Sequence, residues 1–314
     1  MLKILNTLDI TGVPEIHEIF SNHQLINISP DRDIAIKEIV DSDAYLASAA
    51  IKIDEDFLEQ ANHLKIIGSP STGTDHMDLN LIKKKGISCY DLSKEFDLIN
   101  SFTATSELAF TLLLSLIRKI VPASQDAKNG IWAREKYSGV QLFNKTFGIV
   151  GLGRLGKISA KIANGFGMNV IAHDTQEKSL HGVKMVDLEN LARESDFISI
   201  HVHLNSSTEN LINLDFFNKM KKSGIVINTS RGKIINEKDL ILALNNNLIS
   251  GACLDVIDGE WLTKKELYDH PLVKYSRSHE NLFLSPHIGG ATQESIYGAR
   301  LFMAKKIAFF LGIN

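Results

Sequence analysis

The sequence predicts an α/β fold made of two units that each contain a parallel sheet. From residue 147 onward, short apolar runs rich in Ile and Val alternate with helix-length segments, as in parallel strands buried on both faces. The first hundred residues repeat this alternation more weakly. A chain of 314 residues is also long for one typical domain, so we expect two domains that each bury a core.

In the first unit, four apolar runs predict strands and two segments between them predict helices. The helix that ends in KKKG should stop at Gly86, because helices often end at glycine. The expected strands are LINI (25–28), AYLAS (44–48), LKIIGSP (64–70) and ISCYD (87–91), and the expected helices are DEDFLEQANH (54–63) and MDLNLIKKKG (77–86).

Residues 103–121 are apolar on nearly every side, which predicts a buried helix between the units or at a subunit contact. In the second unit, Asn236 can cap a helix whose apolar face carries Leu240, Leu244 and Leu248. The charged segment 263–281 is interpreted as a mobile loop. The expected strands lie at 147–153, 168–174, 183–186, 197–202, 224–230, 252–256 and 281–286.

Composition excludes several classes of protein. The net charge of -3, the pI near 6.4 and the lack of long basic runs argue against a nucleic-acid-binding protein. Cys89 and Cys253 lie in apolar runs, which indicates buried thiols and a reducing compartment. The N-terminus lacks the apolar region of a signal peptide, and the most apolar stretch is too short for a membrane span. We therefore predict a cytoplasmic protein without a membrane association, and no metal site because no His/Cys cluster has ligand spacing.

A glycine-rich turn follows the first strand of the second unit. Gly151, Gly153 and Gly156 stand where a strand meets a helix, the context in which such a loop admits a pyrophosphate at the helix N-terminus. Asp174 ends the next strand, where a carboxylate binds the adenosine ribose and repels a 2'-phosphate, so NAD is preferred over NADP. The alternatives are a purely structural glycine turn and an S-adenosylmethionine site of a methyltransferase.

Other strand ends carry residues that a buried sheet would not choose for stability. Arg231 follows GIVINTS, Asp255 and Glu260 follow ACL, and His287 follows NLFLSP. Ligands of open parallel sheets bind beyond the carboxyl ends of the strands. Arg231, Glu260 and His287 are therefore expected to gather near the glycine loop.

Four motifs in this order and spacing, VGLGRLGK, NTSRG, LDVIDGE and SPHIGGAT, resemble the D-isomer-specific 2-hydroxyacid dehydrogenases. That family includes 3-phosphoglycerate, glyoxylate/hydroxypyruvate and D-lactate dehydrogenases. LKIIGSPSTGTDHMDL is similar to the family's substrate loop and TATSELAFTLLLSLIRKI to its interdomain helix, so the resemblance covers about residues 40–310.

The resemblance implies two doubly wound parallel-sheet domains. A Rossmann NAD-binding domain, residues 103–289, would be inserted into a flavodoxin-like substrate domain made of residues 1–102 and 290–314. It also implies a homodimer formed through the NAD-binding domains, and a small 2-oxo or 2-hydroxy acid as the substrate.

The same resemblance gives the strand-end residues their roles. His287 would act as general acid and base, since hydride transfer to a 2-oxo acid creates an alkoxide that needs a proton. Glu260 would sit against the imidazole, favour its protonated form and fix its tautomer. Arg231 would bind the substrate carboxylate through its guanidinium fork and polarise the carbonyl. Further residues implied for the cofactor are Arg154, Leu155, Thr105, His203, Thr229, Asp255, Gly289 and Gly290, with Asp255 on the nicotinamide carboxamide; backbone N–H groups around Ser71, Thr72 and Gly73 would hold the substrate carboxylate.

The sequence departs from the family pattern at three places. Ser48 stands where phosphoglycerate dehydrogenases usually carry arginine, although Lys52 could partly replace that charge. His203 and Trp261 stand where proline is common, which suggests an altered cleft wall. Two alternatives remain: phosphoglycerate dehydrogenase proper, and a non-catalytic NAD(H)-sensing protein similar to the corepressors that share this fold.

Overall fold

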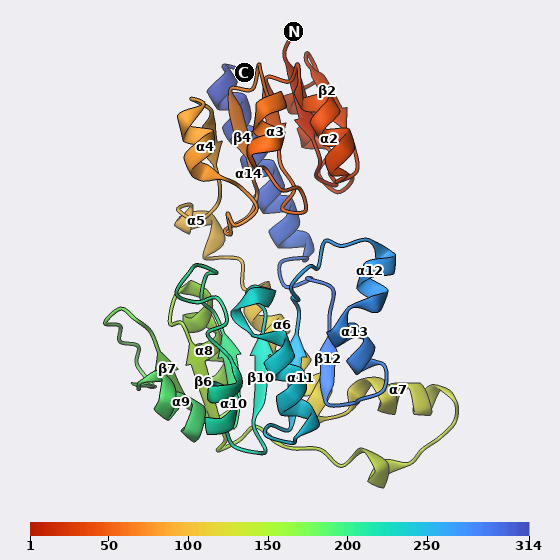
Figure 1. Ribbon diagram of the computed structural model, residues 1–314, viewed down its shortest axis with the longest axis vertical. Helices are drawn as coiled ribbons and strands as arrows, with labels where there is room; N and C mark the ends of the chain where they lie inside the picture. Colours follow the sequence, from red (N-terminus) through yellow and green to blue (C-terminus); the bar gives the residue numbers. More distant parts are fainter. Residues whose placement is uncertain (314) are drawn as a thin grey trace. The chain divides into compact units, whose positions relative to one another are not determined.

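The computed structural model describes residues 1–313, which form two compact units (Figure 1). The first unit contains Met1–Phe102 and the segment that begins at Thr292, and the second contains Thr103–Ala291. The chain therefore leaves the first unit after Phe102 and returns to it at Thr292. Asn314, the last residue of the expected substrate domain, lies outside the described residues.

The first unit is built on a five-stranded parallel sheet with the order β2-β1-β3-β4-β5. This is the flavodoxin-like order. Helices α2, α3 and α4 pack on one face, and α1, α5 and α14 pack on the other. The elements are β1 (Lys3–Asn6), α1 (Glu15–Ile19), β2 (Gln24–Asn27), α2 (Arg32–Ile39), β3 (Ala44–Leu46), α3 (Glu55–Gln60), β4 (Ile66–Gly68), α4 (Leu79–Lys84), β5 (Ser88–Tyr90), α5 (Phe96–Ile99) and α14 (Gln293–Leu311).

Local sequence explains where the helices of this unit start. Asp31, Asp54 and Asp78 each accept a hydrogen bond from the backbone N–H three residues later and so cap α2, α3 and α4. Helix α14 reaches the sheet closely because β4 ends in glycine: a Cβ on Gly68 would stand 2.7 Å from the sulfur of Met303. Residues from the two ends of the chain thus share one core.

The second unit is built on a seven-stranded parallel sheet with the order β12-β11-β10-β9-β6-β7-β8. Its strand order is that of the Rossmann fold, with a seventh strand at one edge. The strands are β6 (Thr146–Val150), β7 (Asn169–His173), β8 (Val183–Met185), β9 (Phe197–Ile200), β10 (Ile225–Asn228), β11 (Gly251–Leu254) and β12 (Leu282–Leu284).

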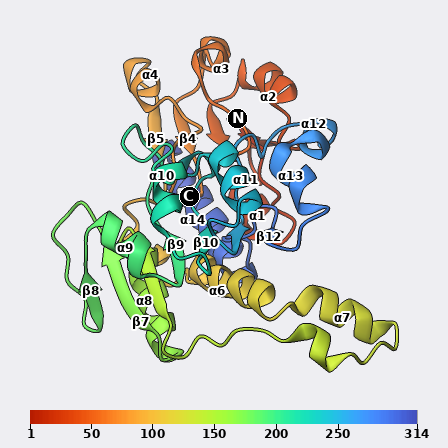
Figure 2. The ribbon, with the colours of Figure 1, turned by 60° about the horizontal axis from the view of Figure 1, so that its bottom comes forward.

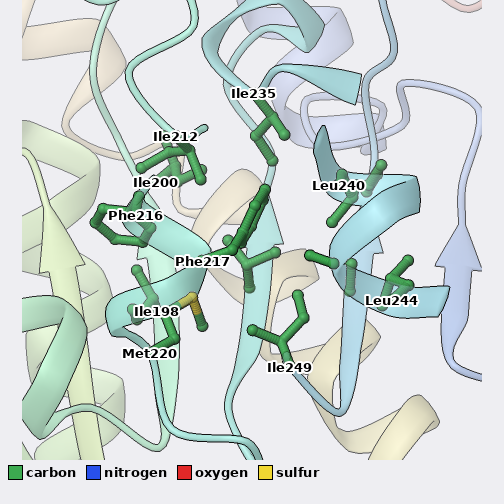
Figure 3. Close-up of a cluster of buried hydrophobic side chains, with 14 of the residues drawn as sticks. Ile198, Ile200, Ile212, Phe216, Phe217, Met220, Ile235, Leu240, Leu244 and Ile249 are labelled. Atoms are coloured by element: carbon green, nitrogen blue, oxygen red, sulfur yellow. The ribbon is translucent and has the colours of Figure 1, made fainter. Parts of the chain in front are cut away.

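Two apolar clusters cover the two faces of this sheet. One cluster, drawn in Figure 3 around Phe217, joins the strands to α9, α10, α11 and α13. The other joins them to α6 and α8, with Phe110 stacked on Phe147. The helices are α6 (Ala104–Ile117), α7 (Ile120–Lys128), α8 (Arg154–Gly165), α9 (Leu188–Glu194), α10 (Leu214–Lys219), α11 (Glu237–Asn245), α12 (Lys264–Asp269) and α13 (Pro271–Ser276), with 3-10 turns at Arg134–Tyr137 and Gly232–Ile234.

Two predictions about these elements are wrong. The helix expected over 103–121 stops at Ile117, because Lys119 adopts a left-handed conformation with φ of 51°, and the next helix, α7, buries none of its residues. The charged segment 263–281 is no loop but two helices. Thr263 and Glu266 form a capping box at the start of α12, and Pro271 occupies the first turn of α13.

None of the helices in the described part of the chain combines the length and the apolarity that crossing a bilayer requires.

Candidate active site

The glycine loop joins β6 to α8, and each of its glycines meets different surroundings. Gly151 has φ of 96°, and a Cβ there would stand 2.7 Å from the His201 carbonyl oxygen. A Cβ on Gly156 would stand 2.1 Å from the Gly151 oxygen. The start of α8 can therefore pack this closely against the end of β6 only because residue 156 has no side chain. A Cβ on Gly153 would meet nothing within 4 Å. Space is therefore left beside the loop at the N-terminus of α8, where phosphate groups bind favourably.

Asp174 follows β7 and touches this loop. Its Oδ2 accepts the Leu152 N–H at 2.8 Å and pairs with Lys178 Nζ at 2.7 Å, and its Oδ1 accepts the Gln176 N–H at 2.9 Å. Burial raises the pKa of the Asp174 carboxyl, but Lys178 and the two N–H donors outweigh it and the pKa lies below its usual value. Asp174 is therefore an ionised acceptor beside the glycine loop, and the loop, helix end and carboxylate together fit a dinucleotide.

His287 and Glu260 form a direct pair. The His287 Nδ1–H donates to Glu260 Oε1 at 2.8 Å, which leaves Nε2 as the ring nitrogen available to a reacting group. Glu260 Oε2 is buried and finds no hydrogen-bond partner within residues 1–313. Trp261 lies against the same imidazole, with ring centroids 5.8 Å apart.

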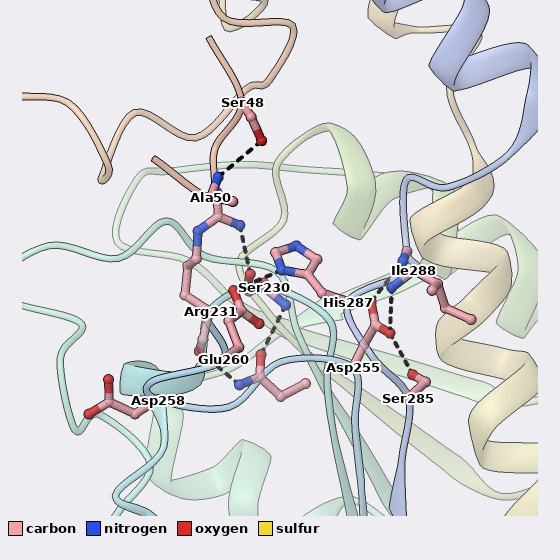
Figure 4. Close-up of polar contacts among 12 residues, drawn as sticks. Ser48, Ala50, Ser230, Arg231, Asp255, Asp258, Glu260, Ser285, His287 and Ile288 are labelled. Carbon is pink, nitrogen blue, oxygen red and sulfur yellow. Dashed lines mark hydrogen bonds and ion pairs between the residues drawn. The ribbon is translucent and has the colours of Figure 1, made fainter. Parts of the chain in front are cut away.

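The turn that presents His287 is held by Asp255. The Asp255 carboxylate accepts the N–H groups of Ile288 at 2.9 Å and Gly289 at 2.7 Å and the Ser285 hydroxyl, while its carbonyl oxygen accepts the His287 N–H at 2.8 Å (Figure 4). Asp255 is 1% exposed. Its carboxylate thus organises the loop after β12, a role that the sequence did not suggest.

Arg231 follows β10 in the same unit, and Figure 4 shows its side chain near Glu260 and His287. One guanidinium nitrogen, Nη1, donates to the Ser230 carbonyl oxygen at 2.8 Å. The next residue, Gly232, lies directly under the loop that carries Glu260: a Cβ on Gly232 would stand 2.1 Å from the Ile257 carbonyl carbon and 2.3 Å from the Asp258 nitrogen. The Arg231 turn and the Glu260 loop are therefore in backbone contact.

The other cofactor residues expected in this unit lie in several environments. Thr229 is buried, and its hydroxyl has no hydrogen-bond partner among the residues that the structure describes. Thr105 lies near Gly289, since a Cβ on that glycine would stand 3.2 Å from the threonine methyl. Arg154 and Leu155 belong to the first turn of α8, where the Leu155 oxygen accepts a hydrogen bond from the Ser106 hydroxyl. His203 and Gly290 are exposed in loops.

The expected substrate loop belongs to the first unit and follows β4. The Ser71 hydroxyl donates to the Gly73 oxygen at 2.7 Å, and the Ser71 carbonyl accepts the N–H of Leu92, which follows β5, so the loop around Thr72 is held from within and by the neighbouring strand end. In the same unit the Ser48 hydroxyl accepts the Ala50 N–H at 3.3 Å. Lys52 pairs with Asp54 at 3.3 Å.

Sequence reasoning missed three residues that shape the site: Gly232, Glu237 and His270. The glycine after Arg231 was a visible signal of close approach. Glu237 follows the expected helix cap Asn236 and His270 lies in the charged segment 263–281, so neither stands out in the sequence as part of a site. Both contact the loop that carries Glu260. Within the described residues no group of three or more His, Cys, Asp or Glu side chains could hold a metal ion.

Comparisons with known proteins cover both units. Residues 110–289 match the family described as D-isomer specific 2-hydroxyacid dehydrogenase, NAD binding domain, and residues 4–96 match its catalytic domain. The chain is 36% identical over 293 residues to a glyoxylate reductase of Thermococcus litoralis, which covers 90% of this chain and 84% of the relative.

Two further similarities complete the comparison. A D-3-phosphoglycerate dehydrogenase of Methanocaldococcus jannaschii is 33% identical over 87% of this chain, which spans only 50% of that relative's length. The solved structure of D-lactate dehydrogenase from Aquifex aeolicus, complexed with NAD and lactic acid, superposes with a TM-score of 0.86 at 26% identity and covers 98% of this chain and 95% of that one.

Proposed function

Because the chain belongs to the D-isomer specific 2-hydroxyacid dehydrogenase family, we propose that it interconverts a small 2-oxo acid and the corresponding D-2-hydroxy acid. Its membership makes it an NAD-dependent oxidoreductase that acts on the CH–OH group of 2-hydroxy acids. When bound, the cofactor donates or accepts the hydride equivalent at carbon 2 of the acid. The residues of this chain position the acid and move the proton.

His287 is the proposed proton donor and acceptor. In the direction of reduction, its Nε2–H gives a proton to the oxygen at carbon 2 as that oxygen becomes an alcohol, and in oxidation Nε2 takes the proton back. Glu260 supports both steps, because its hydrogen bond to Nδ1 at 2.8 Å fixes which nitrogen faces the substrate. Arg231 binds the substrate carboxylate and polarises the carbonyl.

The remaining expected residues complete the proposed site. Thr105, Thr229, His203, Asp255, Gly289 and Gly290 line the cofactor, while Ser71, Thr72 and Gly73 offer backbone N–H groups to the carboxylate of the substrate. Asp255 has a second task in this proposal, since its carboxylate already accepts the backbone of Ile288 and Gly289.

The His287–Glu260 pair is the observation that carries the proposal, and it gives the test. Oxidation of NADH would be followed with glyoxylate, hydroxypyruvate, pyruvate, 2-oxoglutarate and longer 2-oxo acids. We expect turnover with at least one small unphosphorylated acid. His287→Ala should lower kcat for that acid by about a hundredfold or more, as for loss of a general acid, while the Kd for NADH stays within about twofold.

Two outcomes would contradict the proposal. A His287→Ala variant that reduces the acid at the native rate would remove the assigned role. A native protein that binds NADH but turns over no acid of the panel would favour the NAD-sensing alternative instead.

Phosphoglycerate is the second candidate substrate because of the 33% identity to phosphoglycerate dehydrogenases, whose length the chain spans only by half. The first unit argues against it. Ser48 brings no charge to the place where that activity usually has arginine, and the Lys52 ammonium is paired with Asp54. A phosphate group would therefore lack a free cation here, so we place phosphoglycerate after the small acids.

The proposed assembly is a homodimer through the second unit. Helix α7 and the segment after it, which together we call the arm, extend away from the seven-stranded sheet (Figure 2). Within the arm, the Asp126 carboxylate accepts hydrogen bonds from Lys136 at 2.7 Å and from Tyr137. The arm exposes large apolar side chains that contribute nothing to the core of its own unit, a surface typical of a subunit contact. They are Ile120, Val121, Ile131 and Trp132.

A further inference from the structure

The loop that carries Glu260 is held at one residue, Asp258, by two side chains. The Asp258 N–H donates to Glu237 Oε1 at 2.7 Å. The Asp258 carbonyl oxygen accepts from His270 Nε2 at 2.9 Å. Both backbone polar groups of Asp258 are thus bound from outside the loop, by the first residue of α11 and by the residue that caps α13.

Glu237 and His270 also contact each other. Glu237 Oε2 lies 3.3 Å from His270 Nε2, and the two side chains are only 17% and 8% exposed. His270 Nδ1 accepts the Leu272 N–H at 3.3 Å, so the ring proton sits on Nε2, where it points at the Asp258 oxygen and the Glu237 carboxylate. The tautomer of His270 is therefore determined by its neighbours.

This pair is an unusual choice if stability were its only purpose. Burial raises the pKa of the Glu237 carboxyl, while the Asp258 N–H and His270 act in the opposite direction. Well-packed apolar residues usually serve a core at least as well as a buried acid beside an imidazole. What the polar pair provides is a directed hydrogen bond to each of the two peptide groups that flank Asp258.

The position of Asp258 determines the position of Glu260. The residue between them is Gly259, which turns the chain with φ of 78°. Glu260 then reaches His287 Nδ1 at 2.8 Å. On the other side the loop rests on Gly232, where no space for a Cβ remains. A shift of Asp258 would therefore displace the carboxylate of Glu260, since only Gly259 and two peptide bonds separate the two residues.

We propose that Glu237 and His270 are positioning residues that hold the Glu260 carboxylate against His287, an inference that rests on the proposed roles of Glu260 and His287. Neither side chain needs to touch the substrate or the cofactor. Their effect on the reaction passes through Glu260.

The test uses Glu237→Ala and His270→Asn in the full-length protein. Glu237→Ala removes the acceptor of the Asp258 N–H. His270→Asn keeps a good helix cap for the Leu272 N–H but loses the bond to the Asp258 oxygen. We expect each change to lower kcat by about tenfold to a hundredfold, as we also expect for Glu260→Gln, because the imidazole of His287 loses its fixed orientation. The KM for NADH should change little.

Asp239→Ala is the matched control. Asp239 lies in the same turn of α11 and also accepts a backbone N–H, but its donor, at 3.0 Å, is Leu214 at the start of α10 and not a residue of the loop that carries Glu260. Asp239→Ala should leave kcat at its native value. In a Glu260→Gln background, adding Glu237→Ala or His270→Asn should change kcat by less than about twofold, because the residue they position has lost its charge.

The outcomes separate the inference from the proposed function. If Glu260→Gln and His287→Ala act at the native rate, the proposed function fails. If those two variants are impaired while Glu237→Ala and His270→Asn behave like Asp239→Ala, only the positioning inference is overturned. It is also overturned if both variants fail to fold, since the pair would then support the whole unit, or if they reduce kcat equally with and without Glu260.

Discussion

His287 adopts a left-handed backbone conformation, with φ of 51°, that few residues other than glycine enter readily. A conformation of this kind costs about 1–3 kcal/mol and persists only where its surroundings enforce it. Here the enforcing group is Asp255, which binds the backbone of His287 through its carbonyl and that of the next two residues through its carboxylate. The direction of the imidazole is therefore set by Asp255, the residue that follows the neighbouring strand β11.

The guanidinium fork of Arg231 gives a first prediction at this scale. Arg231→Ala should raise KM for the 2-oxo acid by about tenfold to a hundredfold through the loss of charge-assisted hydrogen bonds, with a smaller fall in kcat. Arg231→Lys keeps the charge without the planar fork, so its KM for the acid should lie between the native value and that of Arg231→Ala. Steady-state kinetics with varied acid at saturating NADH measures both. Unchanged KM values in both variants would reject the assignment.

The second residue-scale prediction concerns His201, which follows β9 and lies next to the glycine loop. Burial lowers the pKa of His201 from its usual 6.5 to about 4. Above pH 6.5 the ring is neutral in the folded and the unfolded chain, so it adds no pH dependence. Between pH 6.5 and 4 the unfolded chain binds a proton that the folded chain does not, and the free energy of unfolding should fall by up to about 3 kcal/mol on acidification.

Tryptophan fluorescence of the whole protein reports on the unit that contains His201, because both tryptophans, Trp132 and Trp261, lie in that unit. Urea unfolding followed by tryptophan fluorescence between pH 7 and 4 should show a steeper loss of stability in the native protein than in His201→Asn. His17→Asn, which changes an exposed histidine of the other unit, is the control. Parallel curves for the native protein and His201→Asn would contradict the prediction.

At the scale of elements, the site depends on two loops that follow neighbouring strands. The turn after β10 carries Arg231, the loop after β11 carries Glu260, and Gly232 lets the two backbones meet. Parallel pairing brings these loops to the same edge of the sheet. Their relative position is thus set by the β10–β11 register and refined by a glycine.

Gly232→Ala tests this contact. A methyl group would stand 2.1 Å from a backbone carbon that cannot move alone, so we expect the Glu260 loop to shift, with a loss of stability of about 1–3 kcal/mol and a fall in kcat of about tenfold or more. Gly165→Ala at the end of α8 is the control, since a Cβ there meets nothing within 4 Å. Urea unfolding and kcat measure the two effects. A Gly232→Ala variant as active as Gly165→Ala would show that the loops do not need this contact.

At the scale of the whole molecule, the arm around α7 gives a prediction about assembly. Trp132 is 88% exposed within its own unit, and burying it in a dimer would contribute about 2 kcal/mol or more. Trp132→Ser should therefore weaken the dimer by at least about thirtyfold in Kd. Sedimentation velocity over a range of concentrations measures the change.

Phe309→Ser is the matched control, because Phe309 is 86% exposed but lies on α14 in the other unit. It should leave the dimer intact. A native protein that sediments as a monomer at micromolar concentration would disprove the proposed assembly.

Much of the architecture was accessible from local pattern. The strand runs after residue 147 and the capped helix at Asn236 were predicted because periodicity and caps act over a few residues. Strand β1 of the first unit, which lies between β2 and β3, was not, since its four residues, KILN, form too short a run to show a period. The break at Lys119 was missed because continuous apolar character conceals where a helix ends.

The sequence alone determined the α/β class, the NAD-binding glycine loop and the family, because these depend on short contiguous motifs such as VGLGRLG and SPHIGG. Only the tertiary structure decided that Asp255 organises the His287 turn and that Glu237 and His270 form hydrogen bonds with the backbone of Asp258. These contacts join residues that are 12 to 34 positions apart. No local period encodes such pairs, since they form only when the parallel strands bring their loops to one edge of the sheet.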